Sequence, residues 1–200
     1  MWLFALRRTR SIQMTLTVTQ GIPLTLRQPQ FTAEYELRFQ PLTQRGDHLC
    51  WAACVESVLW SMSATRTNQS LLARQFLPSC RVVLPVRDLQ GSRCDEPLQA
   101  TMMSTVWSQV GCEDPQKEMI GESLSARLVS ELSNGSPVQA WVNNYHAVML
   151  YGYRRKEYGT ESVLVMDPQR GYGDYWRALD VSRHWSAIWT GLSLGAHSNA

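Results

Sequence analysis

Apolar and polar residues alternate with a period of two along the first forty positions of the chain. In the clearest run, from Phe31 to Phe39, every second residue is apolar and the intervening ones are polar or charged. Residues 14–18 and 22–26 alternate likewise, and prolines at positions 23, 29 and 41 punctuate the runs. This pattern predicts half-buried strands, with the prolines at turns or sheet edges. We expect residues 1–40 to form a β-rich arm, either integral to a sheet, a pro-segment or a delivery signal.

The period changes after Gly46. Between Cys50 and Met62 the apolar residues recur three and four positions apart, with no glycine or proline among them. That spacing predicts a buried helix. Residues 69–77, 98–110 and 122–132 are predicted as further helices, each followed closely by a proline or a glycine. Residues 78–97 hold three prolines and are predicted to form an irregular loop.

Strands return in the last third of the chain. Residues 137–142, 147–153 and 162–166 are apolar or β-branched runs separated by polar or glycine-containing turns, and Tyr175-Trp176 is a further strand candidate. Helices followed by an antiparallel sheet predict an α+β domain over residues 41–200. In it, an N-terminal helical part with the 50–62 helix at its centre packs on a C-terminal antiparallel β-sheet.

Charge and length limit the function classes. Nineteen Lys and Arg against 17 Asp and Glu give a net charge of +2, which is too small an excess to predict a nucleic-acid partner. No stretch approaches the roughly 20 apolar residues that span a bilayer. At the start, MWLFALRRTR, the apolar residues precede the charges, the reverse of a secretory signal. We expect a soluble protein, cytoplasmic in its producing cell, without a membrane partner or cleavable export signal. A dedicated secretion machine that delivers it into a target cell would leave no such mark.

Cysteine usage argues against a metal site. The five cysteines form no C-x-x-C pair and no histidine lies close to a cysteine pair, so we expect no metal and no cofactor. The odd count leaves at least one thiol unpaired.

Three residues have the types and contexts needed for nucleophilic catalysis. Cys50 lies at the first turn of its helix, where unpaired N–H groups and the helix dipole favour a thiolate. His146 opens one predicted strand and Asp167 ends the next, so two antiparallel neighbours can bring them together at one sheet end. Gln44, six residues before Cys50, offers an amide donor that with the Cys50 N–H would hold an oxyanion.

These residues carry a family resemblance. Q-x5-C-W-A-A-C, Y-H-A-V-M-L-Y-G-Y and V-M-D-P resemble the papain-like cysteine peptidases, and most of all the bacterial effector and bacteriocin-leader peptidases that carry C-W-A-A. The resemblance spans about residues 40–176. It implies that Cys50 is the nucleophile, His146 the general base and acid, Asp167 the orienting residue and Gln44 the oxyanion glutamine. Trp51, Tyr145 and Trp176 are candidates for the substrate cleft.

The resemblance also implies a biological setting and leaves alternatives open. Cys80 and Cys94 occupy positions like those of a cystine loop in some relatives. An effector peptidase would cleave a protein in a target cell, and its producer would hold a cognate immunity or inhibitor protein. The same triad serves acyl transfer or deamidation equally well. A catalytically inactive papain-like module that binds a partner protein through its cleft is the third interpretation.

Overall fold

The computed structural model describes most of the chain from residue 31 onwards. The described residues are 16–17, 23–24, 31–62, 67–80, 88–118, 124–156, 159–179 and 185–192. The first ten residues and most of the alternating runs at 14–18 and 22–26 lie outside this set.

Helices and strands alternate irregularly along the described part of the chain. The helices are α1 (Cys50–Met62), α2 (Gln69–Phe76), the 3-10 turn η1 (Ala100–Met102), α3 (Met103–Gln109) and α4 (Leu124–Ser133). The strands are β1 (Leu16–Thr17), β2 (Pro23–Leu24), β3 (Phe31–Glu36), β4 (Gln116–Glu118), β5 (Val138–Val142), β6 (His146–Lys156), β7 (Glu161–Asp167), β8 (Gly173–Ala178) and β9 (Trp185–Thr190).

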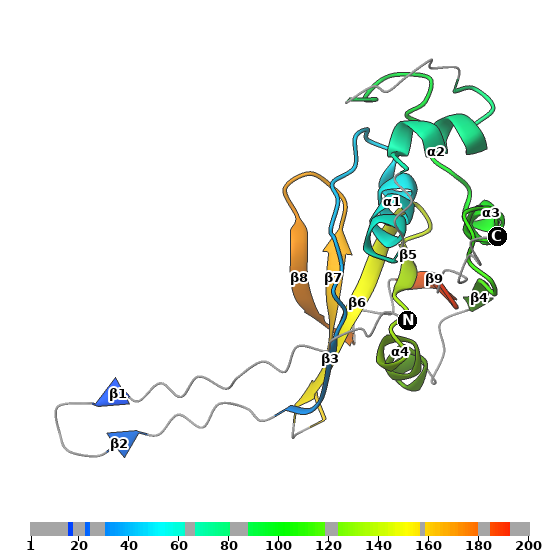
Figure 1. Ribbon diagram of the computed structural model, residues 1–200. Helices are drawn as coiled ribbons and strands as arrows, with labels where there is room; N and C mark the ends of the chain where they lie inside the picture. The colour runs from blue at the N-terminus through cyan, green and yellow to red at the C-terminus, as the bar shows by residue number, and fades with distance from the viewer. Residues whose placement is uncertain are drawn as a thin grey trace.

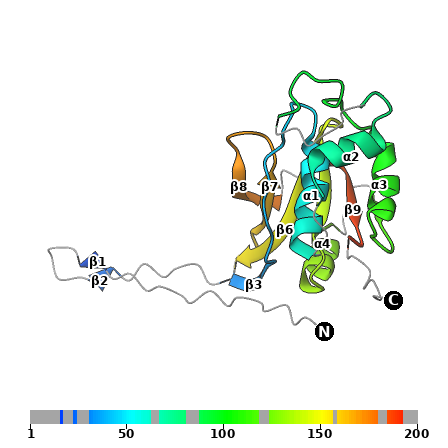
Figure 2. The ribbon, with the colours of Figure 1, turned by 45° about the horizontal axis from the view of Figure 1, so that its top comes forward.

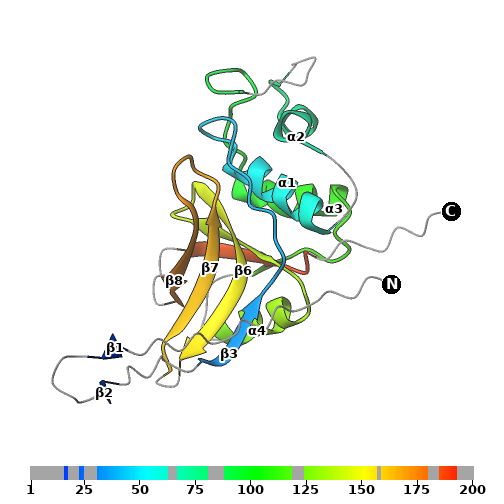
Figure 3. The same cartoon turned by 60° about the vertical axis from the view of Figure 1, so that its left-hand side comes forward.

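An antiparallel sheet forms the centre of the molecule (Figure 1). Its strands follow the order β4-β9-β5-β6-β7-β8, and β3 pairs with β6 outside that path. β6 is long enough to pair with β5 through its first half and with β3 through its second. Figure 3 shows β3, β6, β7 and β8 side by side. The α+β architecture with an antiparallel sheet is therefore as the sequence predicts.

The two faces of the sheet carry different helices. Ala147, Met149 and Tyr151 of β6 pack in one core cluster with α1, α2 and α3, whereas Val148 and Leu150 pack in a second cluster with α4. Figure 2 shows α1 crossing β6, with α2 and α3 around it. Successive side chains of a strand point to opposite faces of the sheet, so β6 contributes to the core on each face. Helix α1 packs on the sheet as predicted, but α4 covers the opposite face.

A bulge in β6 reverses this alternation. Leu150 pairs with Val165 and Gly152 with Leu164, so β6 holds one residue more than β7 at this point. Tyr153 consequently belongs to the α4 side, although Tyr151, two residues earlier, lies on the α1 side. A side chain at Gly152 would stand 2.7 Å from the Cβ of Leu164, so only glycine fits this close approach.

The N-terminal strand joins the sheet. Residues 31–36 of the predicted arm pair with β6 as β3, from Phe31 opposite Lys156 to Glu36 opposite Gly152. β1 and β2 pair with each other, and Figure 1 draws them away from the sheet. The described end of the predicted arm is thus structurally part of the domain that follows it.

The sequence-based prediction does not include two strands, the edge strand β4 and its neighbour β9. β9 pairs with β5, and β4 pairs with β9. The predicted helix over residues 98–110 divides into η1 and α3. Among the described residues, no helix combines the length and apolar character of a membrane span.

Candidate active site

Cys50 is the first residue of α1. The helix begins with the Ala53 N–H donating to the Leu49 carbonyl at 3.0 Å, so the N–H groups of residues 50–52 have no partner within the helix. Cys50 is only 5% exposed, and its Sγ accepts a hydrogen bond from the Ala147 backbone N–H at 3.4 Å. Unpaired N–H groups at a helix start and a further N–H on the sulfur favour an anion at this atom.

A tight turn brings His146 to the start of β6. The turn runs through Asn143 and Asn144, whose φ angles of 50° and 64° lie in the left-handed region, and the Tyr145 N–H donates to the Val142 carbonyl at 3.1 Å. Asparagine tolerates that conformation better than most residues because its short side chain bonds locally. His146 then pairs with Val142, next to Ala147, whose N–H reaches Cys50.

Asp167 ends β7 and binds His146. The His146 Nε2 lies 2.8 Å from Asp167 Oδ1. Burial alone would lower the pKa of the His146 imidazole, but its interactions with Asp167 and with Cys50 outweigh burial and raise this pKa to about 9. With Nε2 bound to the carboxylate, Nδ1 is the nitrogen left for the thiol. The structure therefore brings Cys50, His146 and Asp167 together.

Asp167 is itself held by two further donors. The Gln169 N–H donates to Oδ1 at 3.0 Å, and the Tyr175 hydroxyl donates to Oδ2 at 3.4 Å. Burial would raise the pKa of Asp167, yet the hydrogen bonds, that from His146 foremost, lower it below its ordinary value. The carboxylate is thus kept ionised beside the imidazole. Sequence reasoning missed this role of Tyr175, although the residue stands in a predicted strand a few positions after Asp167.

Gln44 lies beside this group but uses its amide differently from the prediction. Its backbone N–H donates to the Pro168 carbonyl at 2.8 Å, which ties the loop before α1 to the residue after Asp167. The side-chain Nε2 donates to the carbonyls of Gly46 at 2.7 Å and Asp47 at 2.9 Å. An amide flip would set Oε1 against two carbonyl oxygens, so this orientation is the favourable one. Both amide hydrogens are therefore engaged inside the loop, and Oε1 is buried without a hydrogen-bond partner among the described residues.

The three aromatic residues predicted for the substrate cleft lie in different environments. Tyr145, directly before His146, is 71% exposed. Trp51 is fully buried and packs edge-on against Phe76, so the prediction of a cleft position is wrong for this residue. The position after the helix-start cysteine points into the core formed with α2.

Trp176 is not brought to the triad. It pairs with Leu164, three positions before Asp167 on β7, and lies against the core on the α1 side. The Arg154 guanidinium stands 4.1 Å from its ring centroid. Core packing and this cation–π contact account for the position of Trp176 without a ligand, and its place in a substrate cleft stays a prediction.

The remaining cysteines have separate structural roles. Cys80 and Cys94 form a disulfide, as in the cystine loop that the family resemblance implies. Cys54 and Cys112 are buried free thiols. Burial raises the pKa of Cys54 well above its ordinary value and that of Cys112 to about 12. Among the described residues, no group of three or more His, Cys, Asp or Glu side chains is arranged to hold a metal ion.

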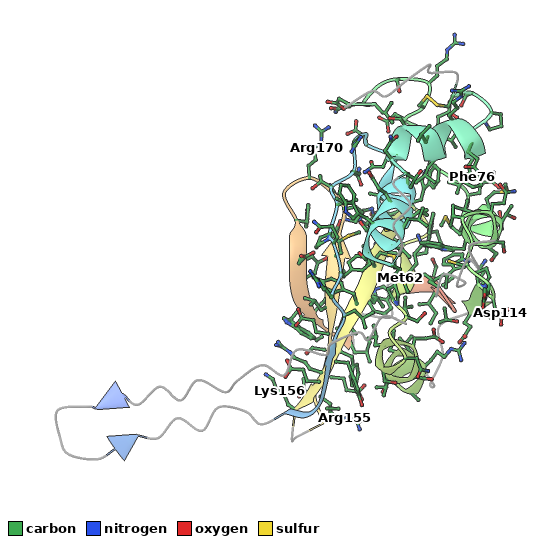
Figure 4. The ribbon with its side chains drawn as sticks, viewed as in Figure 1. Met62, Phe76, Asp114, Arg155, Lys156 and Arg170 are labelled. Carbon is green, nitrogen blue, oxygen red and sulfur yellow. A yellow bond between two sulfur atoms is a disulfide. The ribbon has the colours of Figure 1, made fainter. Side chains whose placement is uncertain are left out.

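The triad lies at one end of the sheet. Figure 4 shows Arg170, from the loop between β7 and β8, at the end where α1 begins, whereas Arg155 and Lys156 lie at the opposite end. The start of α1, the start of β6 and the end of β7 meet at this point. Such a group can ionise a thiol, exchange a proton with a substrate and keep the imidazole oriented.

Comparison with solved structures supports the fold. The chain resembles the crystal structure of UfSP from C. elegans with a TM-score of 0.53 and 14% sequence identity, over 79% of this chain and 34% of that one. The chain thus spans about a third of that protein. The similarity shows that the two chains share a fold over this region. No family model and no curated protein matches the sequence.

Proposed function

We propose that this chain is a cysteine peptidase that cleaves a polypeptide through a Cys50–His146–Asp167 triad. The observation that carries the proposal is the position of the His146 ring. Its Nε2 is bound to Asp167 at 2.8 Å, while its other nitrogen is left for a thiol that already accepts the Ala147 N–H. An imidazole whose pKa lies near 9 stays protonated at neutral pH, which suits an imidazolium–thiolate pair.

In the acylation step the Cys50 thiolate attacks the carbonyl carbon of the scissile peptide bond. A C–S bond forms, and the electron pair of the C=O bond moves to the oxygen. As the tetrahedral intermediate collapses, the C–N bond breaks and the His146 imidazolium gives its proton to the leaving amine. The products of this step are a free amine and a thioester on Cys50.

In the deacylation step a water molecule attacks the thioester. His146, now neutral, takes a proton from that water, and the C–S bond breaks to release a carboxylic acid. Protonation of His146 and departure of the thiolate restore the starting pair. Asp167 keeps the ring oriented throughout and stabilises each imidazolium form.

The oxyanion of both intermediates needs donors. The Cys50 backbone N–H, free of any intrahelical partner, supplies the first. Gln44 supplies the second by exchanging one of its two loop carbonyls for the oxyanion. The Gln44 backbone N–H already bonds the carbonyl of Pro168, the residue after Asp167, so we expect this exchange to need only a local movement of the side chain.

The biological role we propose is that of a bacterial effector acting on a protein in a target cell. Support comes from the resemblance of the C-W-A-A, Y-H-A-V and V-M-D-P segments to effector peptidases. The Cys80–Cys94 disulfide favours an oxidising destination after synthesis in the cytoplasm. A soluble protein delivered by a dedicated secretion system fits this role. A cognate inhibitor protein in the producer is the expected partner.

Labelling with a thiol-reactive peptide epoxide tests the enzymatic part of the proposal. The unmodified protein should be labelled at Cys50, and Cys50→Ala should abolish labelling, whereas Cys112→Ser should retain it. Target proteomes incubated with the protein and with Cys50→Ala should then differ in their fragments. Identical fragment patterns would contradict proteolysis. Mass shifts of glutamine deamidation or transamidation without cleavage would assign the triad to acyl transfer instead.

A further inference from the structure

The loop before α1 is held by polar side chains on two sides. We call residues 43–48 the approach loop, because they lead into Cys50 and carry Gln44. On one side, Gln69 at the start of α2 accepts the Arg45 N–H at 2.7 Å and donates to the Thr43 carbonyl at 3.0 Å. Gln69 is fully buried, and it also donates to the buried carboxylate of Glu56 at 2.9 Å.

On the other side, Asp95 holds the end of the approach loop. Its carboxylate accepts the Asp47 N–H at 3.0 Å and the His48 N–H at 2.8 Å, and it also accepts the Gly91 N–H at 3.1 Å. The residue is 8% exposed. Burying a carboxylate is costly unless hydrogen bonds replace its hydration, and here three backbone N–H groups do so.

Gly46 makes this contact possible. A Cβ atom at Gly46 would stand 2.4 Å from Oδ1 of Asp95 and 2.7 Å from its Cγ. No side chain fits there unless the carboxylate or the loop moves. The glycine and the aspartate, which lie far apart in sequence, are therefore matched in shape as well as in hydrogen bonding.

The contacts of Asp95 continue to Gln44. The residues whose backbone surrounds the carboxylate, Gly46 and Asp47, also supply the two carbonyls that bind the Gln44 Nε2. Displacing the loop at these residues would displace the Gln44 amide and the chain that leads into Cys50. Asp95 thus contacts the backbone that sets the position of both proposed oxyanion donors.

The segment carrying Asp95 is itself anchored. Cys94 is bonded to Cys80, which follows α2 after a short turn. Gln69, on the other side of the approach loop, belongs to the same helix. Both supports of the loop are therefore tied to α2, one by the helix backbone and one through a covalent bond.

We propose that Asp95 is a positioning residue for the oxyanion hole, acting through the backbone of the approach loop and touching no substrate atom. The proposal rests on the proposed function, since it assigns a role toward the same nucleophile. Removing one oxyanion donor costs an enzyme roughly 10²–10³-fold in rate. A residue that acts on such donors indirectly should cost about 10–10²-fold.

Two probes separate this role from a purely structural one. A peptide aldehyde adds the Cys50 thiolate to its carbonyl carbon, and the new C–S bond places an oxyanion in the hole before it takes a proton from His146. Iodoacetamide alkylates the same sulfur by displacing iodide and forms no oxyanion. A fault confined to the oxyanion hole therefore weakens aldehyde binding and leaves the alkylation rate unchanged.

Asp95→Ala should raise the aldehyde inhibition constant and lower kcat/KM by about 10–10²-fold, with the iodoacetamide rate at Cys50 within about twofold of the unmodified protein. Gly46→Ala should likewise weaken aldehyde inhibition and leave the alkylation rate unchanged, although the Asp95 carboxylate is still present. Asp88→Ala is the matched control, because Asp88 is an exposed carboxylate of the same segment that bonds Arg170 and the Gln90 N–H. It should change neither reaction by more than about twofold.

Asp95→Asn covers the case in which Asp95→Ala does not fold, since it keeps the size of the side chain and one acceptor oxygen. It should lower aldehyde affinity selectively and to a smaller extent. Unchanged aldehyde affinity in these variants would overturn the proposal, and so would an equal loss of aldehyde binding and alkylation. If neither probe modifies Cys50 selectively in the unmodified protein, it is the proposed function that fails.

Discussion

Two thiols one turn apart on α1, those of Cys50 and Cys54, are similarly buried but have different neighbours. Cys50 is 5% exposed and Cys54 is fully buried. Cys50 faces His146 and the Ala147 N–H, at the end of the helix where donors are unpaired. Cys54 lies one turn further in, where burial raises the pKa of its thiol well above the ordinary value. Since both sulfurs are shielded from water, we expect any difference in their reactivity to come from the charged and N–H neighbours of Cys50.

The largest effect should separate these two residues. Cys50→Ala removes the proposed nucleophile and should lower kcat/KM about 10⁴-fold or more. Cys54→Ala leaves a small cavity in the core and should cost about 1 kcal/mol of stability while activity persists. Steady-state kinetics and thermal unfolding of the two variants measure both quantities. A Cys50→Ala protein that still cleaves its substrate would remove the basis of the comparison.

His146→Ala should have the second-largest effect on activity. It deletes both the proton carrier and the cation beside Cys50, so kcat/KM should fall roughly 10²–10⁴-fold. The alkylation rate of Cys50 at pH 7 should fall towards that of Cys54, because the sulfur loses its charged neighbour. Retention of fast alkylation in this variant would show that the helix start alone activates the thiol.

Asp167→Asn should have a smaller effect, with a displaced pH profile. A hydrogen bond to a charged group contributes about 1.5–3 kcal/mol, so kcat/KM should fall about 10–10²-fold. Without the carboxylate the pKa of His146 should drop from about 9, and the alkaline limb of the kcat/KM profile should move to lower pH. If the alkaline limb stays at the same pH, a group other than His146 determines its position.

The same pair makes stability depend on pH. The pKa of His146 is higher in the folded chain, about 9 against an ordinary 6.5. Its contribution is therefore complete below about pH 6.5 and is lost as pH rises towards 9. The pKa of Asp167 is lowered on folding, so its contribution is present above its ordinary value and is lost as pH falls through the folded one. Denaturant unfolding should show the stability gap between the unmodified protein and Asp167→Asn narrowing from pH 6 to pH 10.

Tyr175→Phe should give the smallest change. Its hydroxyl donates to Asp167 Oδ2 across 3.4 Å, a long hydrogen bond whose loss should lower kcat/KM only about threefold. The partly buried ring stays in place, so thermal stability should change little. A loss as large as that of Asp167→Asn would assign Tyr175 a greater part in orienting the carboxylate.

Local patterns predicted most elements that build this site. The helix predicted from Cys50 to Met62 has those bounds in the structure, and β5, β6 and β7 lie within a few residues of the predicted strands. The spacing of apolar residues and the position of turn-forming residues determine such elements locally. β9, with the sequence WSAIWT, escaped prediction because it shows no clear alternation, although Gly191 directly follows it. Its pairing with β5 joins residues more than forty positions apart.

Local sequence patterns do not predict contacts between residues that lie far apart along the chain. The spacing of Gln44 to Cys50 predicts an oxyanion donor, but the carbonyls that bind its side-chain amide depend on how the approach loop folds. That fold depends in turn on Asp95, 48 positions after Asp47. Trp51 is predicted for the substrate cleft, yet a helix turns successive side chains by about 100°, and this side chain enters the core and is fully buried.

Alkylation rates at individual cysteines show whether the Cys50 thiol is activated. The protein, with its Cys80–Cys94 disulfide intact, is treated with iodoacetamide at pH 7, and the modification of each free thiol is followed over time by mass spectrometry. We predict that Cys50 reacts at least about 10²-fold faster than Cys54 and Cys112, since only its sulfur has a charged partner that favours the thiolate. Equal rates at the three thiols would contradict an activated nucleophile at the start of α1.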